Sequence, residues 1–356
     1  MRMKNFFLIS TGGSGGHVIP AMILHDHLSE KADLIVSTDK RGKKYIDKKI
    51  QSIEIVNTPK LNSFLLFPIN FVIVLLLIIK SLYILKKWRV EKIFSTGGYM
   101  SFPLILAGKI LNLKIYLLEP NHVLGRANKF FLKSCKKIFC YTNEIKKFPN
   151  NFKNKITIIN PLVRKNIYNQ VPKFRNNSKF NIIIVGGSQG AKVFDNKLKD
   201  IIVKISKKNS LRVFHQTNEK NISFLSEFYK KNDIENTIFS YDKNFINIIN
   251  KADLCITRAG ASTLAELSVL NIPFIAVPLP TSKDNHQFEN AKFYQKNNCC
   301  WMVEQDLFEE KIEKILKDVI EEKTDYLKKK TNLKKLNFQN TWLNVNQKIL
   351  RTLDEN

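Results

Sequence analysis

The sequence predicts an α/β protein with two doubly wound parallel sheets. Short runs of β-branched and aromatic residues alternate with longer helical stretches, and these runs fall into two series. Alternation of this kind is typical of parallel sheets covered by helices on both faces. The chain has 356 residues, enough for two domains. Thirteen strands are also more than one twisted sheet usually holds, so we expect two sheets of six or seven.

The division between the two series lies near Asn160-Pro161. A polar segment, residues 169–179, then leads into the second series. We therefore expect a first domain at residues 1–163 and a second at residues 164–339. The apolar side chains between Trp342 and Leu353 predict a terminal helix, at about 340–356, that packs back on the first domain. The expected strands are 5–10, 33–37, 53–56, 92–95, 114–118, 137–141 and 156–159, then 181–185, 211–215, 237–240, 253–257, 273–277 and 300–303.

The charge is strongly positive and uneven. Lys and Arg number 58 against 31 Asp and Glu, for a net charge of +27. Residues 1–163 carry a net +17 and residues 164–356 a net +10. A basic half attracts anionic lipid, phosphorylated substrates or nucleic acid, although much of this charge is ordinary solvated surface. We expect no nucleic-acid partner, because the chain has no RNP-type aromatic motif, zinc-finger spacing or Arg-rich reading helix.

The cysteines and the first apolar run point to a reducing compartment. Five cysteines, an odd number without a C-x-x-C pair, argue against a disulfide framework and a Cys-rich zinc site. The run from Phe6 to Ile9 is too short for the core of a signal peptide, so we do not expect secretion.

The segment from Phe64 to Ile79 departs from the soluble pattern. Its longest uninterrupted apolar run, Phe71 to Ile79, is shorter than the ~20 residues that a spanning helix needs. Two alternatives remain: a buried core helix, or a helix that dips into the lipid interface. The Lys86-Lys87-Trp88-Arg89 cluster that follows favours the interface.

The first expected strand ends in a glycine turn, Ser10-Thr11-Gly12-Gly13-Ser14-Gly15-Gly16-His17. Glycines between a strand and a helix let backbone N–H groups approach a phosphate. The dinucleotide fingerprint fails because Val18 stands at its last glycine position, and Walker A is absent. His17, at the helix start, is either a structural histidine or a base at a pyrophosphate site.

The second series opens in the same way, with Gly186-Gly187-Ser188-Gln189-Gly190-Ala191. Walker A fails again, since Lys192 stands two residues after Gly190. One phosphate-type turn at the start of each domain suggests a ligand held between the carboxyl ends of two sheets.

A third turn runs from Arg258 to Glu266. We expect Ser262 to cap the following helix and the amides of Ala261 to Leu264 to face an anion. Glu266 would accept hydrogen bonds from a ribose diol, or would simply stabilise the helix dipole. Further on, Gln287 and Asn290 offer neutral hydrogen bonds to sugar hydroxyls. The Thr96-Gly97-Gly98-Tyr99 and Glu119-Pro120-Asn121 turns also follow expected strands, so all these loops describe one cleft.

Taken in order, these motifs resemble a known family. They are Gly12-Gly13-Ser14-Gly15-Gly16-His17 with Pro20, Gly97-Gly98-Tyr99, Glu119-x-Asn121, Asn160-Pro161-x-Val163-Arg164, Gly186-Gly187-Ser188-Gln189-Gly190-Ala191, His215-Gln216, Arg258-x-Gly260-Ala261-x-Thr263-x-x-Glu266 and Asp284-x-x-Gln287-x-x-Asn290. The chain resembles, over roughly residues 5–300, the bacterial peptidoglycan N-acetylglucosaminyltransferases that convert lipid I to lipid II. The resemblance implies two Rossmann-like domains facing across a cleft, the GT-B type of glycosyltransferase fold.

The resemblance also implies roles for particular residues. Glu266 would bind the ribose, Ser188 and Arg164 the diphosphate region, and Gln287 and Asn121 the N-acetylglucosamine. Ser14, Gly15 and Gly16 would lie against the donor diphosphate and the acceptor, with Ser14 in place of the usual Thr. Ala261, Ser262, Thr263 and Leu264 would hold the nucleotide, and Asp242 and Phe245 would cap the uracil. His286 stands before Gln287 where a second Gln is common.

The implied reaction is a single inverting displacement with His17 as candidate base. The implied partners are UDP-N-acetylglucosamine, lipid I and an anionic membrane surface met through the Phe64 to Ile79 segment and basic residues. No metal and no cofactor would be required. The implied location is peripheral, on the cytoplasmic face of the bacterial inner membrane, with a part in cell-wall synthesis, cell shape and division.

Three alternatives remain open at this point. A UDP-N-acetylglucosamine 2-epimerase shares the fold, but would need acid and base carboxylates in the cleft and would have no reason to touch lipid. Transfer to a glycolipid other than lipid I is a closer alternative. A nucleotide-sugar sensor or membrane scaffold without turnover is the third, and release of free uridine diphosphate would exclude it.

Overall fold

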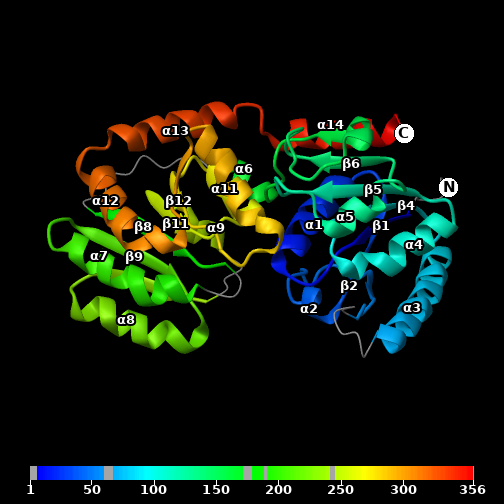
Figure 1. The fold of residues 1–356 in the computed structure, drawn as a ribbon, viewed down its shortest axis with the longest axis horizontal. Helices are drawn as coiled ribbons and strands as arrows, with labels where there is room; N and C mark the ends of the chain where they lie inside the picture. The colour runs from blue at the N-terminus through cyan, green and yellow to red at the C-terminus, as the bar shows by residue number, and fades with distance from the viewer. Residues whose placement is uncertain (1–5, 60–66, 171–178, 188–190, 241–244, 356) are drawn as a thin grey trace. The chain divides into compact units, whose positions relative to one another are not determined.

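The computed structural model describes residues 6–59, 67–170, 179–187, 191–240 and 245–355 (Figure 1). The chain forms two compact units. Unit 1 comprises Met1–Val163 and Thr341–Asn356, and unit 2 comprises Arg164–Asn340. Asn340 accepts a hydrogen bond from the Tyr168 hydroxyl at 2.9 Å, which ties the end of unit 2 to its beginning. This end lies one residue beyond the expected position.

Unit 1 is built on a seven-stranded sheet of order β3-β2-β1-β4-β5-β6-β7, in which every neighbouring pair is parallel. The strands are β1 Phe6–Ser10, β2 Asp33–Thr38, β3 Ile53–Ile55, β4 Val90–Ser95, β5 Lys114–Glu119, β6 Lys137–Cys140 and β7 Ile156–Ile158. Side chains alternate between the faces, so Phe7 and Ile9 enter one core and Leu8 the other. The predicted parallel sheet is confirmed.

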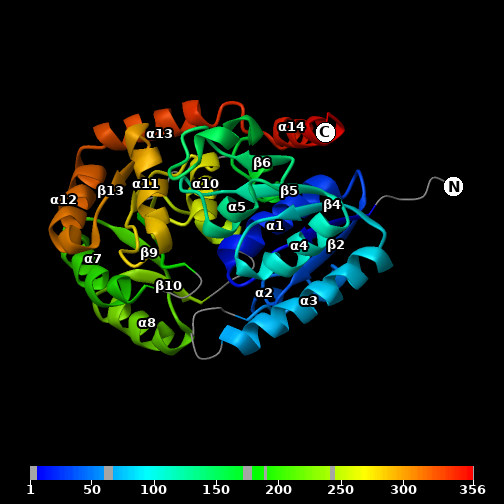
Figure 2. The ribbon, with the colours of Figure 1, turned by 45° about the vertical axis from the view of Figure 1, so that its right-hand side comes forward.

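Helices cover both faces of this sheet (Figures 1 and 2). They are α1 Gly15–Leu28, α2 Lys40–Lys43, α3 Phe67–Lys87, α4 Phe102–Ile110, α5 Arg126–Phe131 and α14 Trp342–Asp354, with 3₁₀ turns η1 Tyr99–Ser101 and η2 Asn150–Lys155. The terminal helix α14 packs on α1: Val345 and Ile349 join the core of that face. The Trp342 ring stacks on His27 with ring centroids 3.6 Å apart.

Unit 2 repeats this plan with six parallel strands in the order β10-β9-β8-β11-β12-β13. The strands are β8 Phe180–Val185, β9 Leu211–Gln216, β10 Glu235–Phe239, β11 Leu254–Thr257, β12 Phe274–Ala276 and β13 Cys300–Met302. Its helices are α6 Lys165–Tyr168, α7 Lys199–Ser206, α8 Ile222–Lys231, α9 Phe245–Ile249, α10 Ala261–Val269, α11 His286–Lys296, α12 Phe308–Glu321 and α13 Thr324–Leu336. Short turns complete it: the π-helical η3 Phe194–Leu198 and the 3₁₀ turns η4 Glu219–Asn221, η5 Lys283–Asn285 and η6 Gln305–Leu307.

Both sheets reverse their strand order at one point. The reversal falls between β1 and β4 in unit 1 and between β8 and β11 in unit 2. In open α/β sheets a ligand binds outside the carboxyl ends of the strands at this point. The predicted glycine turns follow these four strands, so the topology places them where such a fold holds its ligand.

Helix α3 presents apolar side chains to solvent. Its stretch from Pro68 to Lys87 is long and apolar enough to cross a membrane by length and composition, and only 17% of its most apolar window is buried. The uninterrupted run from Phe71 to Ile79 is therefore shorter than the apolar part of this helix. The last turns pack into unit 1, where Ile84 and Leu85 are buried. The exposed large apolar side chains are Ile69, Phe71, Val72, Ile73, Leu75, Leu76, Ile79 and Tyr83. Exposure on this scale contradicts the core-helix alternative.

Candidate functional site

In unit 1, the glycine turn between β1 and α1 is held by Asp39, the residue that follows β2. Its Oδ1 accepts the Gly13 and Gly42 amides, both at 2.8 Å, and its Oδ2 accepts Arg41 Nε at 2.9 Å. Burial alone would raise the pKa of Asp39, but these hydrogen bonds outweigh it and hold the pKa below its ordinary value. Gly13 has φ +81°, and a Cβ there would lie 2.5 Å from Met100 Cε. The turn therefore requires glycine at this position.

Ser14 and His17 lie where the turn becomes helix α1. Ser14 is the exposed N-cap residue, and its carbonyl accepts the amides of His17 and Val18 at 3.0 and 3.2 Å. The next two residues, Gly15 and Gly16, thus present the first amides of the helix. His17 Nδ1 lies 2.9 Å from the Thr96 carbonyl oxygen, beyond β4. Since a carbonyl only accepts, Nδ1 carries the proton, and in the neutral ring Nε2 is then the basic nitrogen.

The turn after β5 is braced by Glu119, which is 3% exposed. Its two carboxylate oxygens accept the Asn121 amide at 3.2 Å, Asn121 Nδ2 at 3.1 Å, the Gly125 amide at 2.8 Å and Asn128 Nδ2 at 3.0 Å. Burial raises the pKa of Glu119 in spite of these bonds. The predicted sugar-binding residue Asn121 is therefore oriented by the buried carboxyl group of Glu119, at the end of β5.

In unit 2, Arg164 and Glu266 form a bidentate pair. Arg164 Nε donates to Glu266 Oε1 at 2.7 Å, and Nη2 donates to Oε2 at 2.8 Å. The Glu266 side chain is 5% exposed and that of Arg164 is 29% exposed. The sequence assigns one residue to a ribose and the other to a diphosphate, and the structure brings the two into direct contact.

The beginning of helix α10 differs from the expectation. The N-cap is Gly260 without a side-chain cap, so Ser262 lies inside the first turn and does not cap the helix. The Leu264 amide donates to the Gly260 carbonyl at 3.0 Å, which leaves the amides of Ala261, Ser262 and Thr263 to head the helix. Since the helix begins at Ala261, Glu266 belongs to its second turn, where it is buried.

Gln287 and Asn290 connect three loops of unit 2. Gln287 Oε1 accepts the Ala259 amide at 3.2 Å and the Leu279 amide at 3.0 Å, which leaves its Nε2 as the donor for a ligand. Asn290 is 1% exposed, and its Nδ2 donates to the Ala259 carbonyl at 3.2 Å. Asn290 thus braces the loop at Ala259, and its expected contact with a sugar stays a prediction.

Comparison with known proteins settles the family. Residues 7–140 match the glycosyltransferase family 28 N-terminal domain, and residues 181–342 match the family's C-terminal domain. The chain belongs to glycosyltransferase family 28.

Curated relatives match most or nearly all of this family 28 enzyme. It is 46% identical to the UDP-N-acetylglucosamine–N-acetylmuramyl-(pentapeptide) pyrophosphoryl-undecaprenol N-acetylglucosamine transferase of Pelagibacter ubique, over 99% of this chain and 100% of the relative. Its identity to the protein of the same name from Rickettsia canadensis is 35%, over 85% of this chain and 87% of the relative. The crystal structure of Acinetobacter baumannii MurG has the same fold, with a TM-score of 0.73 at 21% identity over 98% of this chain and all of the other.

Several residues of the family 28 enzyme that shape these edges belong to none of the predicted motifs. Asp39, Arg41 and Asn128 brace the turns of unit 1, and Asp195 braces unit 2. Asp195 lies 3.2 Å from His215 Nε2 and accepts the Thr217 hydroxyl at 2.7 Å. One signal was available: Asp39 directly follows β2, the position where such sheets place functional side chains.

Three predicted site residues lie partly or wholly outside the residues that the structure describes. Ser188 and Asp242 lie outside the described residues, as does the side chain of Phe245, whose backbone begins α9. Among the residues that the structure does describe, no group of three His, Cys, Asp or Glu side chains is arranged to hold a metal ion. The five cysteines are buried, free thiols.

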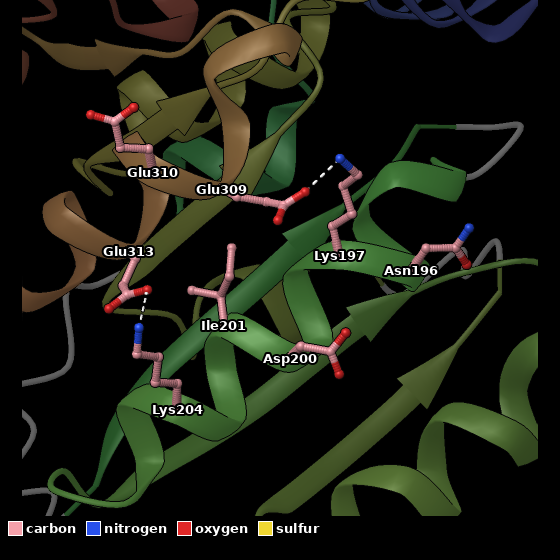
Figure 3. A pocket seen from close by; sticks show the side chains of 8 residues that line it. All are labelled: Asn196, Lys197, Asp200, Ile201, Lys204, Glu309, Glu310 and Glu313. Atoms are coloured by element: carbon pink, nitrogen blue, oxygen red, sulfur yellow. Dashed lines mark hydrogen bonds and ion pairs between the residues drawn. The ribbon is translucent and has the colours of Figure 1, made fainter.

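A charged surface groove of unit 2 is lined by residues of η3, α7 and α12 (Figure 3). Lys204 and Glu313 pair across it at 2.8 Å, and Lys197 pairs with Glu309. Two lysines and four carboxylates line the groove, and none of them belongs to a predicted motif, so we assign the groove no role in the reaction.

Proposed function

We propose that this enzyme transfers N-acetylglucosamine from UDP-N-acetylglucosamine to the 4-hydroxyl of the N-acetylmuramyl unit of lipid I, forming lipid II with inversion at the anomeric carbon. The observation that carries the proposal is the 46% identity to a transferase of that name along the whole of both chains. The preformed edges of both units add chemical support.

The donor binds at the carboxyl edge of unit 2. Glu266 accepts the ribose hydroxyls, and Arg164 balances the diphosphate charge while it holds Glu266 in place. The amides of Ala261, Ser262 and Thr263 face the nucleotide at the start of α10, where the helix dipole favours negative charge. Gln287 Nε2 donates to the sugar. Ser188, Asp242 and Phe245 complete this set from the diphosphate and uracil sides.

The acceptor binds at the carboxyl edge of unit 1. From the same edge, Asn121 contacts the N-acetylglucosamine of the donor, which the acceptor attacks. The muramyl 4-hydroxyl attacks the anomeric carbon, the bond to the diphosphate oxygen breaks, and uridine diphosphate leaves with the bonding electron pair. His17 Nε2 takes the hydroxyl proton. Ser14, Gly15, Gly16 and the helix N-termini stabilise the charge on the leaving group, so the reaction requires no metal and no cofactor.

Unit 1 associates peripherally with the cytoplasmic face of the inner membrane through α3. The exposed apolar side chains of α3 enter the lipid interface, and the surrounding basic residues attract anionic headgroups. Lys80 Nζ donates to the Ile55 carbonyl and Trp88 Nε1 to Glu54 Oε1, both of which anchor the helix to unit 1. An anchored helix of this kind lies on a membrane rather than crossing it.

The epimerase alternative shares the fold. A UDP-N-acetylglucosamine 2-epimerase from Neisseria meningitidis has a TM-score of 0.68 at 14% identity. The exposed apolar helix favours a lipid acceptor instead, because an epimerase acts on a soluble nucleotide sugar alone.

The test is an assay with radiolabelled UDP-N-acetylglucosamine and a short-chain lipid I analogue. We expect label in the lipid product and one uridine diphosphate released per transfer. A labelled 2-epimer without lipid product would show that the enzyme is an epimerase. Label in another glycolipid but not in the lipid I analogue would show that the acceptor is a different glycolipid.

A further inference from the structure

Arg41 lies beside the glycine turn of unit 1, and the proposed function assigns it no contact with a substrate. Arg41 Nε donates to Asp39 Oδ2 at 2.9 Å, and Arg41 Nη2 donates to the Tyr99 hydroxyl. The guanidinium group also reaches Met100 Sδ at 3.8 Å. A Cβ at Gly13 would lie 4.0 Å from Nη2. Two strand ends, those of β2 and β4, therefore fix this cation next to the turn.

The outer side of this guanidinium group remains available. The Arg41 side chain is 50% exposed, whereas that of its partner Asp39 is 6% exposed. Within the described part of the chain, the hydrogen bonds of Arg41 use Nε and Nη2, and none of them uses the two N–H donors of Nη1. The buried carboxylate thus orients the arginine, and the charge that a ligand meets at this position is positive.

The lipid-facing part of α3 lies toward the same edge of the sheet. Helix α3 connects two parallel strands of one sheet, β3 and β4, so it runs antiparallel to them and begins near their carboxyl ends. Most of its exposed apolar residues lie between Ile69 and Ile79, while the buried Ile84 and Leu85 lie near its end, next to the exposed Tyr83. The Thr58 hydroxyl, which precedes α3, also donates to the Met100 carbonyl at 3.3 Å. A molecule with a lipid tail on α3 would have its polar head near Arg41.

We propose that Arg41 binds the pyrophosphate of the lipid-linked acceptor, with Asp39 and Tyr99 as its positioning residues. This inference rests on the proposed function and adds to it the residue that recognises the acceptor's charged head. A planar guanidinium group suits two phosphate oxygens at once. The donor also contains a diphosphate, but unit 1 carries the lipid-facing helix, so we assign Arg41 to the acceptor.

The test compares Arg41→Ala, Arg41→Lys and the matched control Lys43→Ala in the full-length enzyme, with the short-chain lipid I analogue and UDP-N-acetylglucosamine varied separately. Lys43 is an exposed cation on the same short helix. We expect Arg41→Ala to raise the acceptor KM about 10- to 100-fold, since a charge-assisted contact is lost. The donor KM should stay within about twofold, Arg41→Lys should recover part of the loss, and Lys43→Ala should match the unaltered enzyme.

Inhibition by inorganic pyrophosphate gives a second readout that a merely structural role would not move. We expect it to compete with the acceptor in the unaltered enzyme and to weaken in Arg41→Ala. An unchanged acceptor KM in Arg41→Ala overturns the inference, and so does a raised donor KM with a normal acceptor KM. If the unaltered enzyme transfers nothing to the analogue, the proposed function itself is wrong. If the unaltered enzyme and Arg41→Ala both transfer normally, only the role of Arg41 is wrong.

Discussion

Arg164, the first residue of unit 2, donates one hydrogen bond to each carboxylate oxygen of Glu266. We predict that Glu266→Gln and Arg164→Ala each weaken uridine diphosphate binding about 10- to 100-fold, because each removes a charge-assisted contact and disturbs its partner. In the double variant, the fold-loss of uridine diphosphate affinity should be smaller than the product of the two single fold-losses, because the pair acts as one unit.

Calorimetric titration with uridine diphosphate measures this prediction. Arg212→Ala is the matched control, since Arg212 pairs with Glu235 on the surface of the same unit. Additive losses would mean that the two residues contact the nucleotide independently.

Replacement of His17 by Ala should lower kcat by about 10²- to 10⁴-fold and leave donor affinity unchanged, because a proton acceptor is lost and not a binding contact. Single-turnover rates and uridine diphosphate titration check the two halves of this statement. His25→Ala removes another histidine of α1 and should keep full activity. Near-normal turnover in His17→Ala would remove His17 from the mechanism.

The exposed face of α3 should be separable from its buried end. Leu76 and Ile79 are 60% and 63% exposed, so the double change to Ser should weaken binding to anionic vesicles roughly tenfold with little effect on stability. Leu77 packs against the core and is unsuitable for this test.

Leu85→Ser is the contrasting variant, because Leu85 is buried. It should lower the free energy of unfolding by about 2–5 kcal/mol, while the protein that remains folded binds vesicles normally. Vesicle co-sedimentation and thermal melting give the two readouts. Unchanged sedimentation of the Leu76 and Ile79 variant would refute the lipid contact.

Stability should fall as the pH is lowered from about 6.5 toward 4. Burial lowers the pKa of His122 to about 4, so between these values the unfolded chain binds a proton that the folded chain does not. The loss is on the order of 3 kcal/mol from this residue. His122→Asn should therefore flatten the dependence in denaturant unfolding measured across this range, and an unaltered slope would show that His122 is not its source.

Much of the fold could be predicted from the sequence because most strands are short runs rich in β-branched and aromatic residues. The runs that became β1 and β8 end in glycine turns that need backbone freedom, so local residues alone mark the strand ends. The sequence and the structure both divide the chain after Val163. The start of α10 was misplaced because Ser262 is a better cap by type, whereas the chain uses Gly260.

The contacts within the site were harder to predict because they join residues far apart in the chain. Asp39 meets Gly13 and Arg164 meets Glu266 only after strands from different parts of the chain align. The exposure of α3 also depended on tertiary structure, since a uniformly apolar segment does not reveal which half is packed. Residue types thus indicated the edges of the sheets, and the fold determined which side chains meet there.

A crystal structure of the enzyme with uridine diphosphate bound would show directly where the donor nucleotide lies. We predict the ribose hydroxyls on Glu266 and the diphosphate within reach of Arg164 and of the turn that begins at Gly186. A nucleotide bound elsewhere, with Glu266 and Arg164 still paired only to each other, would contradict this prediction.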